Sequence, residues 1–271
     1  METLSALLGP IYSAPLWPDF FSSIGLPRLA YHFTTLLTSA ICCHAIFLVS
    51  FPISRTFFAS YRALRGYSVI NWPIHCVSMA FSTTILMLAA PMLLDQELRH
   101  DRVFGNNSYS GTVLAIACGY FLWDSLIVLS YVHEAGVGFV IHGFSCLLTY
   151  VTSFRPVLNF YGAVFLMFEL STPFLNVHWF CDKMNLSGSR IQWINGIVLL
   201  LTFFGGRIVF GLTMSYCFWV DMLAEWDRVP LVVSGIYCVS NIVLNILNIF
   251  WFHKMISAVR KRFIDDKPHK E

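Results

Sequence analysis

The chain has 271 residues, of which 57% are hydrophobic and only 12% are charged, with a formal net charge of +2. Soluble domains carry about 25% charged residues, so this chain has too few polar side chains to cover a water-exposed surface, and the composition indicates an integral membrane protein. The high hydrophobic and low charged fractions exclude a soluble enzyme and a disordered scaffold. The small net charge excludes a nucleic-acid binder, because neutralising phosphates requires an excess of Lys and Arg.

The first 28 residues contain four prolines and lack the basic stretch of a cleavable signal peptide. We expect residues 1–28 to form an irregular lumenal segment that lies against the membrane. Trp17, Phe20 and Phe21 would then sit at the interface, where aromatic side chains are favoured.

The rest of the chain predicts an all-α, polytopic bundle of about seven transmembrane helices. A bilayer core requires about 20 apolar residues per helix, and backbone groups in lipid must be paired within the helix. The expected spans are residues 30–52, 69–94, 109–132, 136–152, 157–180, 191–219 and 230–253. The fourth is the shortest.

The distribution of Lys and Arg predicts the orientation. If the chain crosses the membrane seven times, eleven of the 17 Lys and Arg residues lie on the same side as the C-terminus. Since basic loops stay cytosolic, we expect a lumenal N-terminus. Residues 29–64 would be the first span with a basic cytosolic loop, and residues 256–271 a basic cytosolic tail, with residues 65–255 as the main transmembrane domain.

Ionisable side chains occur inside four predicted spans, at Asp124, His142, Glu169 and Arg207. Such groups are costly at membrane depth and usually face a cavity or a partner. At about 1.5 Å rise per residue, Asp124 lies roughly 12 Å and His142 roughly 9 Å from the same membrane face. We therefore expect these two to meet, with Glu169 near the midplane and Arg207 further toward the outer side.

Two interpretations of these four groups remain open. In the first, Asp124 holds His142 and Glu169 pairs with Arg207, so that the charges only lock the bundle. In the second, they line a polar chamber in which His142 acts as general base or nucleophile and Asp124 orients it.

Three asparagines of the last span, Asn241, Asn245 and Asn248, have the spacing of one helical face. Amides that face lipid are penalised, so this face should point into the bundle. It either hydrogen-bonds to neighbouring helices or lines a lipid headgroup site, and both interpretations remain open.

No metal or redox site is predicted. The eight cysteines form no CxxC pair and lie in or beside apolar runs, which favours a packing role. His32, His44 and His75 lie near or within the first two spans, and we expect them to be packed and hydrogen-bonded. Neither an HxxxH nor an HExxH pattern occurs.

Three ordered runs resemble the TLC-domain family, which includes the ceramide synthases. They are GYFLWDSL at residues 119–126, IHGF at 141–144 and FELSTPFLN at 168–176. The third run is the most specific and is closest to the small TLC-domain-containing proteins. The resemblance covers roughly residues 65–255 and implies six core helices around a lipid-accessible cavity, with an extra helix at one end.

The resemblance also implies a role in lipid synthesis, sensing or trafficking, mostly in the endoplasmic reticulum. His142 matches the first of the paired histidines of ceramide synthases, but Gly143 stands where the second is expected. The later pair of aspartates that ceramide synthases carry is also absent here. These two departures argue against ceramide synthase activity and leave another acyl-group reaction open.

We therefore expect a protein of lipid homeostasis that binds an acyl lipid or sphingoid base within the bundle. If it transfers an acyl group, the catalytic pair would be His142 and Asp124, with acyl-CoA as co-substrate and no resident cofactor. The expected lipid contacts are Glu169, Arg207, Asn176, Asn241, Asn245 and Asn248. The alternative is a non-catalytic lipid or ion transporter, or a cargo-binding membrane adaptor.

Overall fold

The structure is a computed structural model that describes residues 15–265, except for the side chains of residues 262–265. The described residues form helices joined by turns, with no strand among them. The predicted all-α bundle is confirmed. Of the predicted terminal segments, residues 1–14 and 266–271 lie outside the described part.

Six helical stretches of the described chain have the length and apolar composition of a membrane span: Leu29–Phe57, Tyr67–Leu94, Ser108–Ser130, Asn159–Lys183, Arg190–Ala224 and Leu231–Lys261. They correspond to six of the seven predicted spans. The fourth predicted span forms a helix of only 16 residues, Val137–Thr152. Such a helix rises about 24 Å, which is less than the roughly 30 Å of a hydrocarbon core.

Several spans consist of more than one helical segment. In chain order the segments are α2 (Pro18–Ser23), α3 (Leu29–Phe57), α4 (Ala59–Ala63), α5 (Tyr67–Ala89), η1 (Ala90–Leu94), α6 (Gln96–His100), α7 (Ser108–Ser130), α8 (Val132–Ala135), α9 (Val137–Thr152), α10 (Asn159–Leu166), η2 (Met167–Ser171), α11 (Thr172–Lys183), α12 (Arg190–Phe203), η3 (Phe204–Phe210), α13 (Gly211–Ala224) and α14 (Leu231–Asp265).

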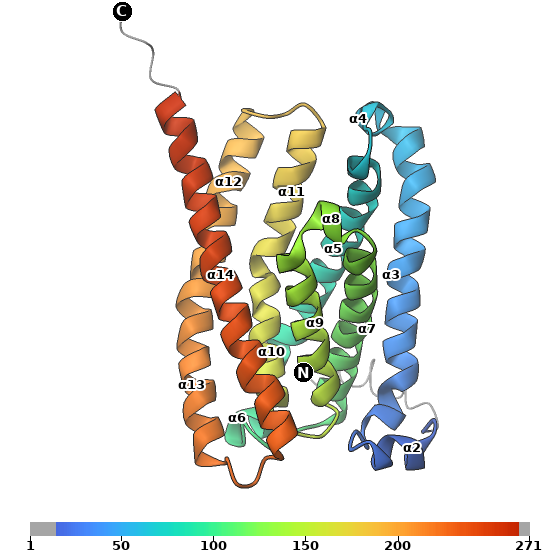
Figure 1. Ribbon diagram of the computed structural model, residues 1–271, viewed down its shortest axis with the longest axis vertical. Coiled ribbons are helices and arrows are strands. Elements are labelled where there is room, and N and C mark those ends of the chain that lie inside the picture. Colours follow the sequence, from blue (N-terminus) through green and yellow to red (C-terminus); the bar gives the residue numbers. More distant parts are fainter. Residues whose placement is uncertain (1–14, 266–271) are drawn as a thin grey trace, which may run out of the picture.

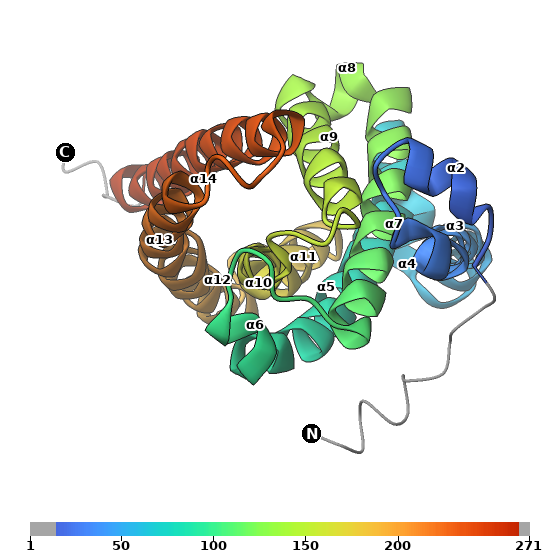
Figure 2. The same ribbon diagram turned by 90° about the horizontal axis from the view of Figure 1, so that it is seen from below.

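The helices form a ring with one helix outside it. Going round the ring, α7 contacts α9, α9 contacts α14, α14 contacts α13, α12 contacts α11, and α11 contacts α5, which returns to α7. Figures 1 and 2 show this closed arrangement, with α3 packed on the outer side of α7 and α5. The six-helix ring and the extra helix agree with the architecture that the sequence resemblance implied.

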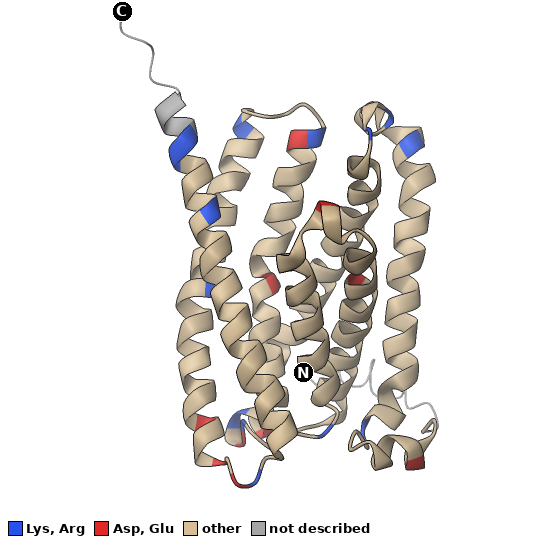
Figure 3. Ribbon diagram, viewed as in Figure 1, with Lys and Arg blue, Asp and Glu red and all other residues tan. Residues whose placement is uncertain are grey.

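Charged residues gather at the two ends of the bundle, as Figure 3 shows. The end that carries α4 and the α11–α12 turn, which we call the upper end after Figure 1, holds mainly Lys and Arg. The lower end, which carries α2 and α6, holds acidic and basic residues together. The first described residues lie at the lower end and the end of α14 at the upper end.

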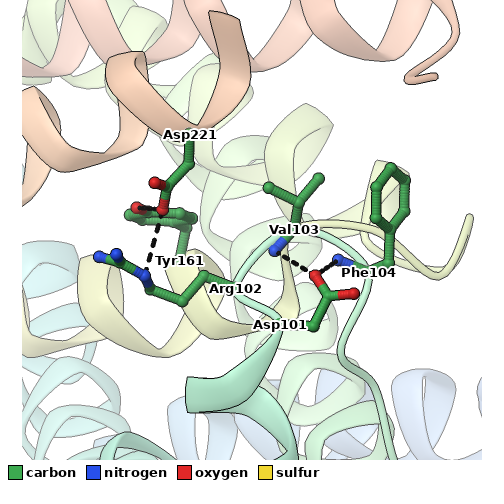
Figure 4. A network of polar contacts seen from close by, with 6 residues as sticks. All are labelled: Asp101, Arg102, Val103, Phe104, Tyr161 and Asp221. Atoms are coloured by element: carbon green, nitrogen blue, oxygen red, sulfur yellow. Dashed lines mark hydrogen bonds and ion pairs between the residues drawn. The ribbon is translucent and has the colours of Figure 1, made fainter. Parts of the chain in front are cut away.

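A polar network lies at the lower end (Figure 4). The Asp221 carboxylate of α13 pairs with Arg102 at 3.2 Å and accepts a hydrogen bond from the buried Tyr161 hydroxyl of α10. Asp101 accepts from the backbone N–H groups of Val103 at 3.1 Å and Phe104 at 2.7 Å. The loop after α6 is thereby held against two ring helices.

Candidate functional site

A cavity of about 490 Å³ lies inside the ring. Its wall carries five of the eight candidate residues, namely Asp124, His142, Glu169, Asn176 and Arg207. They come from α7, α9, η2, α11 and η3, so segments far apart in the sequence converge on one space. The convergence of the four ionisable groups is the arrangement that the chamber interpretation requires.

A second, much smaller cavity of about 30 Å³ adjoins the first and shares Phe121, His142 and Glu169 with it. Asn241 and Asn248 lie on its wall. Asn245 lines neither of these two cavities, so it is the one candidate residue that does not reach the polar interior.

Glu169 lies in a break within its membrane span. The segment η2 has 3₁₀ geometry, and the Thr172 N–H that follows it bonds to the Glu169 carbonyl. Pro173 occupies the first turn of α11, where its missing N–H is tolerated. The shift to the tighter pattern takes the Thr172 N–H away from the Phe168 carbonyl, its partner in a regular α-helix.

The Phe168 carbonyl instead accepts a hydrogen bond from Arg207. Arg207 lies in η3, a π-helical stretch that begins with Phe204-Gly205-Gly206, and its Nε donates to the Phe168 carbonyl at 2.9 Å. Its Nη1 donates to Asn248 Oδ1 at 3.2 Å, and its Nη2 donates to Thr172 Oγ1 at 3.3 Å. The buried guanidinium therefore joins η2, α11 and α14 at one level of the bundle. π-Helical stretches often occur at functional sites.

The two ion pairs of the first interpretation do not form. The described residues contain three salt bridges, Arg102–Asp221, Lys183–Asp182 and Arg228–Glu225, and none of them is inside the ring. Asp124 does not bond to His142, and Arg207 bonds to a carbonyl, an amide and a hydroxyl instead of to Glu169. The prediction that these charges neutralise each other in two direct pairs is wrong.

The His142 imidazole packs between aromatic side chains and lies next to the Cys146 thiol. It packs edge-on against Trp251 with centroids 5.4 Å apart and against Phe121 at 6.2 Å. Both of its ring nitrogens lie 3.9 Å from Cys146 Sγ, one helical turn away. The imidazole thus has only weak polar partners in the protein and faces the cavity.

Gly143 explains how α9 approaches α7 so closely. A Cβ at this position would lie 3.0 Å from Ser125 Oγ and 3.3 Å from Asp124 Oδ2. A second histidine, as in the ceramide synthases, would require the Ser125 and Asp124 side chains of α7 to shift. Glycine at this position thus allows the close packing of α9 on α7.

The asparagine face of α14 points inward, as predicted, and most of its bonds join helices. Asn241 accepts from Trp219 Nε1 at 3.1 Å and donates to Ser215 Oγ at 3.0 Å. Asn245 donates to the same Ser215 hydroxyl at 2.9 Å. These contacts connect α13 with α14, so Asn241 and Asn245 act mainly as interhelical links.

His75 is a cavity residue that was not among the predicted site residues. Its Nδ1 lies 2.6 Å from Asn176 Oδ1, and its ring stacks on Trp179 with centroids 4.1 Å apart. It is packed and hydrogen-bonded as predicted, but it also lines the large cavity with Asn71 and Ser78. The spacing of these three polar residues on α5 is that of one helical face, a signal that could have identified them.

The polar interior contains two carboxylates that lack a hydrogen-bond donor or a cation as partner within the described part of the chain. No hydrogen bond or ion pair of the described residues involves the carboxylate of Asp124 or Glu169, although both line the cavity. Apolar side chains, including Phe139, Leu199 and Phe203, complete the wall. The arrangement can accommodate a molecule with a hydrocarbon part and a hydrogen-bond donor at mid-depth.

Residues 71–257 match the family model of the TLC domain. A TLC domain-containing protein of Schizosaccharomyces pombe, itself uncharacterised, is 38% identical over 96% of this chain and 89% of its own length. Topoisomerase I damage affected protein 4 of Saccharomyces cerevisiae is 31% identical over 71% of this chain and 70% of its own length. TLC domain-containing protein 4 of Homo sapiens is 27% identical over 82% of this chain and 89% of its own length. No solved structure matches the chain.

Proposed function

The chain belongs to the TLC-domain family, and from this premise we propose that it binds an acyl lipid or sphingoid base inside the helical ring and serves lipid homeostasis. The observation that carries the proposal is the meeting of two unpartnered carboxylates, Asp124 and Glu169, in a cavity of about 490 Å³ with largely apolar walls. Ligand pockets usually have volumes of about 300–1,000 Å³. The lipid's amine or hydroxyl group donates to the carboxylates while its chain lies along the apolar wall.

The same cavity supports acyl transfer from acyl-CoA to the bound lipid. In that reaction His142 accepts the proton of the attacking hydroxyl or amine, a new ester or amide bond forms, and the proton passes to the departing CoA thiolate. Asp124 lies on the same wall without bonding to His142, so its role is electrostatic stabilisation of the imidazolium. Two supporting facts are the weak protein partners of His142 and its contact with both cavities.

We place the protein in the endoplasmic reticulum membrane, with its upper end in the cytosol and its N-terminus in the lumen. The excess of basic residues at the upper end supports this orientation through the positive-inside rule.

The experiment is a lipidomic comparison of cells that carry wild type, His142→Ala, His44→Ala or no protein. His44 is the matched control, because it is an exposed histidine on α3, outside the ring. Loss of the protein should alter acyl profiles, and His142→Ala should reproduce the loss while His44→Ala should not. Unchanged profiles on deletion would refute the lipid role. A His142→Ala strain that matches wild type would refute catalysis and leave binding intact.

Reconstitution into vesicles distinguishes a transporter from the lipid-binding protein proposed above. Purified protein in vesicles should retain a bound acyl lipid and move no labelled lipid or ion across the bilayer. Movement of a labelled substrate would favour the transporter.

A further inference from the structure

The small cavity of about 30 Å³ has the size and the lining of a water site. A buried cavity needs about 10–15 Å³ to hold one water molecule, so this one has room for one or two but not for an acyl chain. Aromatic and aliphatic side chains form much of its wall, and Glu169, Asn248 and His142 also lie on it. Buried cavities lined by several polar groups bind water, whereas purely apolar ones remain dry.

The Asn248 amide has a buried donor without an acceptor. Its oxygen accepts from Arg207 Nη1 at 3.2 Å. Arg207 lines only the large cavity and Asn248 only the small one, so the Asn248 Nδ2 group lies on the side of the small cavity. There it is buried and makes no hydrogen bond to the described residues. Buried donors are rarely left without a partner, and this one therefore indicates an acceptor inside the small cavity.

Glu169 and His142 supply the complementary acceptors. The Glu169 side chain is only 7% exposed, takes part in no salt bridge of the described residues and lines both cavities. His142 also lines both cavities, and a neutral imidazole has one accepting nitrogen. Two acceptors and one donor match a water molecule that donates to Glu169 and His142 and accepts from Asn248. A carboxylate accepts about four hydrogen bonds, so Glu169 can also accept from a lipid in the large cavity.

We propose that the small cavity binds a nucleophilic water molecule and that the protein hydrolyses acyl thioesters, with water in place of the lipid as acyl acceptor. The inference rests on the proposed function, because it uses the same acyl-CoA and the same base. The water oxygen attacks the thioester carbonyl carbon while His142 accepts a proton from the water. A C–O bond forms, the C–S bond breaks, and the proton passes to the CoA thiolate. The products are a fatty acid and CoA.

The test supplies palmitoyl-CoA to the purified full chain in detergent micelles, in ¹⁸O-labelled water and without an added acceptor lipid. Mass spectrometry measures the label in the released palmitate, and a thiol reagent measures CoA. Wild type should release both in equal amounts, with one labelled oxygen in each palmitate. His142→Gln should abolish the release, whereas His44→Ala, at an exposed position outside the ring, should match wild type. Release by His142→Gln at the wild-type rate would overturn the inference.

Substitutions in the small cavity test where the water binds. Leu244 lines only this cavity, so Leu244→Phe fills the space without removing a polar group. Thr149→Val removes a hydroxyl group from the same wall without adding bulk. Leu201→Phe is the matched control, because Leu201 is 64% exposed on α12. Leu244→Phe should lower palmitate release about tenfold through displacement of the positioned water, Thr149→Val by a smaller factor, and Leu201→Phe should not lower it.

Lipid that copurifies with each variant, measured by native mass spectrometry, reports separately on the proposed function. Wild type, Leu244→Phe and Thr149→Val should retain the same lipid. Equal palmitate release by these three proteins would overturn the water site. If wild type retains lipid but releases no labelled palmitate, the hydrolytic activity is refuted and the proposed function stands. If wild type retains no lipid, the proposed function itself fails.

Discussion

Replacement of Arg207 tests how much its three interhelical hydrogen bonds contribute to the stability of the ring. Arg207→Met keeps a long side chain but removes all three donors, so the Phe168 carbonyl, Asn248 Oδ1 and Thr172 Oγ1 each lose a partner. Interhelical hydrogen bonds in membranes contribute about 0.6 kcal/mol on average and about 1.7 at most. Three such bonds amount to roughly 2–5 kcal/mol of unfolding free energy. Arg207→Lys retains the charge with one donor group and should lose about half of that.

The assay is unfolding of the purified protein in mixed micelles of increasing SDS content, followed by tryptophan fluorescence. Arg55→Met is the matched control, because Arg55 is an exposed residue at the end of α3. An exposed substitution away from special features changes stability by at most about 0.5 kcal/mol. If Arg207→Met and Arg55→Met unfold at the same SDS fraction, Arg207 does not hold the ring together as argued.

Further predictions concern the α7–α9 contact, the interior carboxylate and the lower end. Gly143→His should reduce stability by about 1–3 kcal/mol through overpacking against α7, measurable by the same unfolding assay, and equal stability would refute the steric account. Glu169→Gln should keep the fold but lower retention of amine-bearing lipids in native mass spectrometry, and unchanged retention would exclude a direct contact. Arg102→Ala should cost less than about 1 kcal/mol because its ion pair is solvent-accessible. Asp221→Ala should cost more, since Asp221 also accepts from Tyr161, and the reverse order would contradict the network.

The positions of the helices could be predicted from the sequence because the bilayer imposes a length and a composition on each span. The convergence of Asp124, His142, Glu169 and Arg207 could also be anticipated, since ionisable groups in lipid must face inward. The distance of each residue from the membrane face follows from its position in the span, so the sequence could predict at which depth each of these groups lies.

The partners of these groups could not be predicted, because pairing depends on rotation about each helix axis and on local breaks in the backbone. Opposite charge alone favoured Glu169 as the partner of Arg207. The 3₁₀ turn beside Pro173 instead leaves the Phe168 carbonyl as an acceptor at that level, and Arg207 bonds to it. Likewise, Gly143 predicts close packing only once α7 is known to lie next to α9.

The breaks in two helices also explain why the carboxylates of the interior have no hydrogen-bond or ion-pair partner among the described residues. A regular α-helix keeps its carbonyls for its own N–H groups, and a buried arginine beside two such helices would pair with the nearest carboxylate. Here the 3₁₀ turn of η2 supplies a carbonyl and the π-helical η3 positions Arg207 to bond to it. Because backbone and amide oxygens satisfy the guanidinium, Glu169 and Asp124 stay available on the cavity wall. The two irregular segments thus separate the arginine that stabilises the ring from the carboxylates that can meet a ligand.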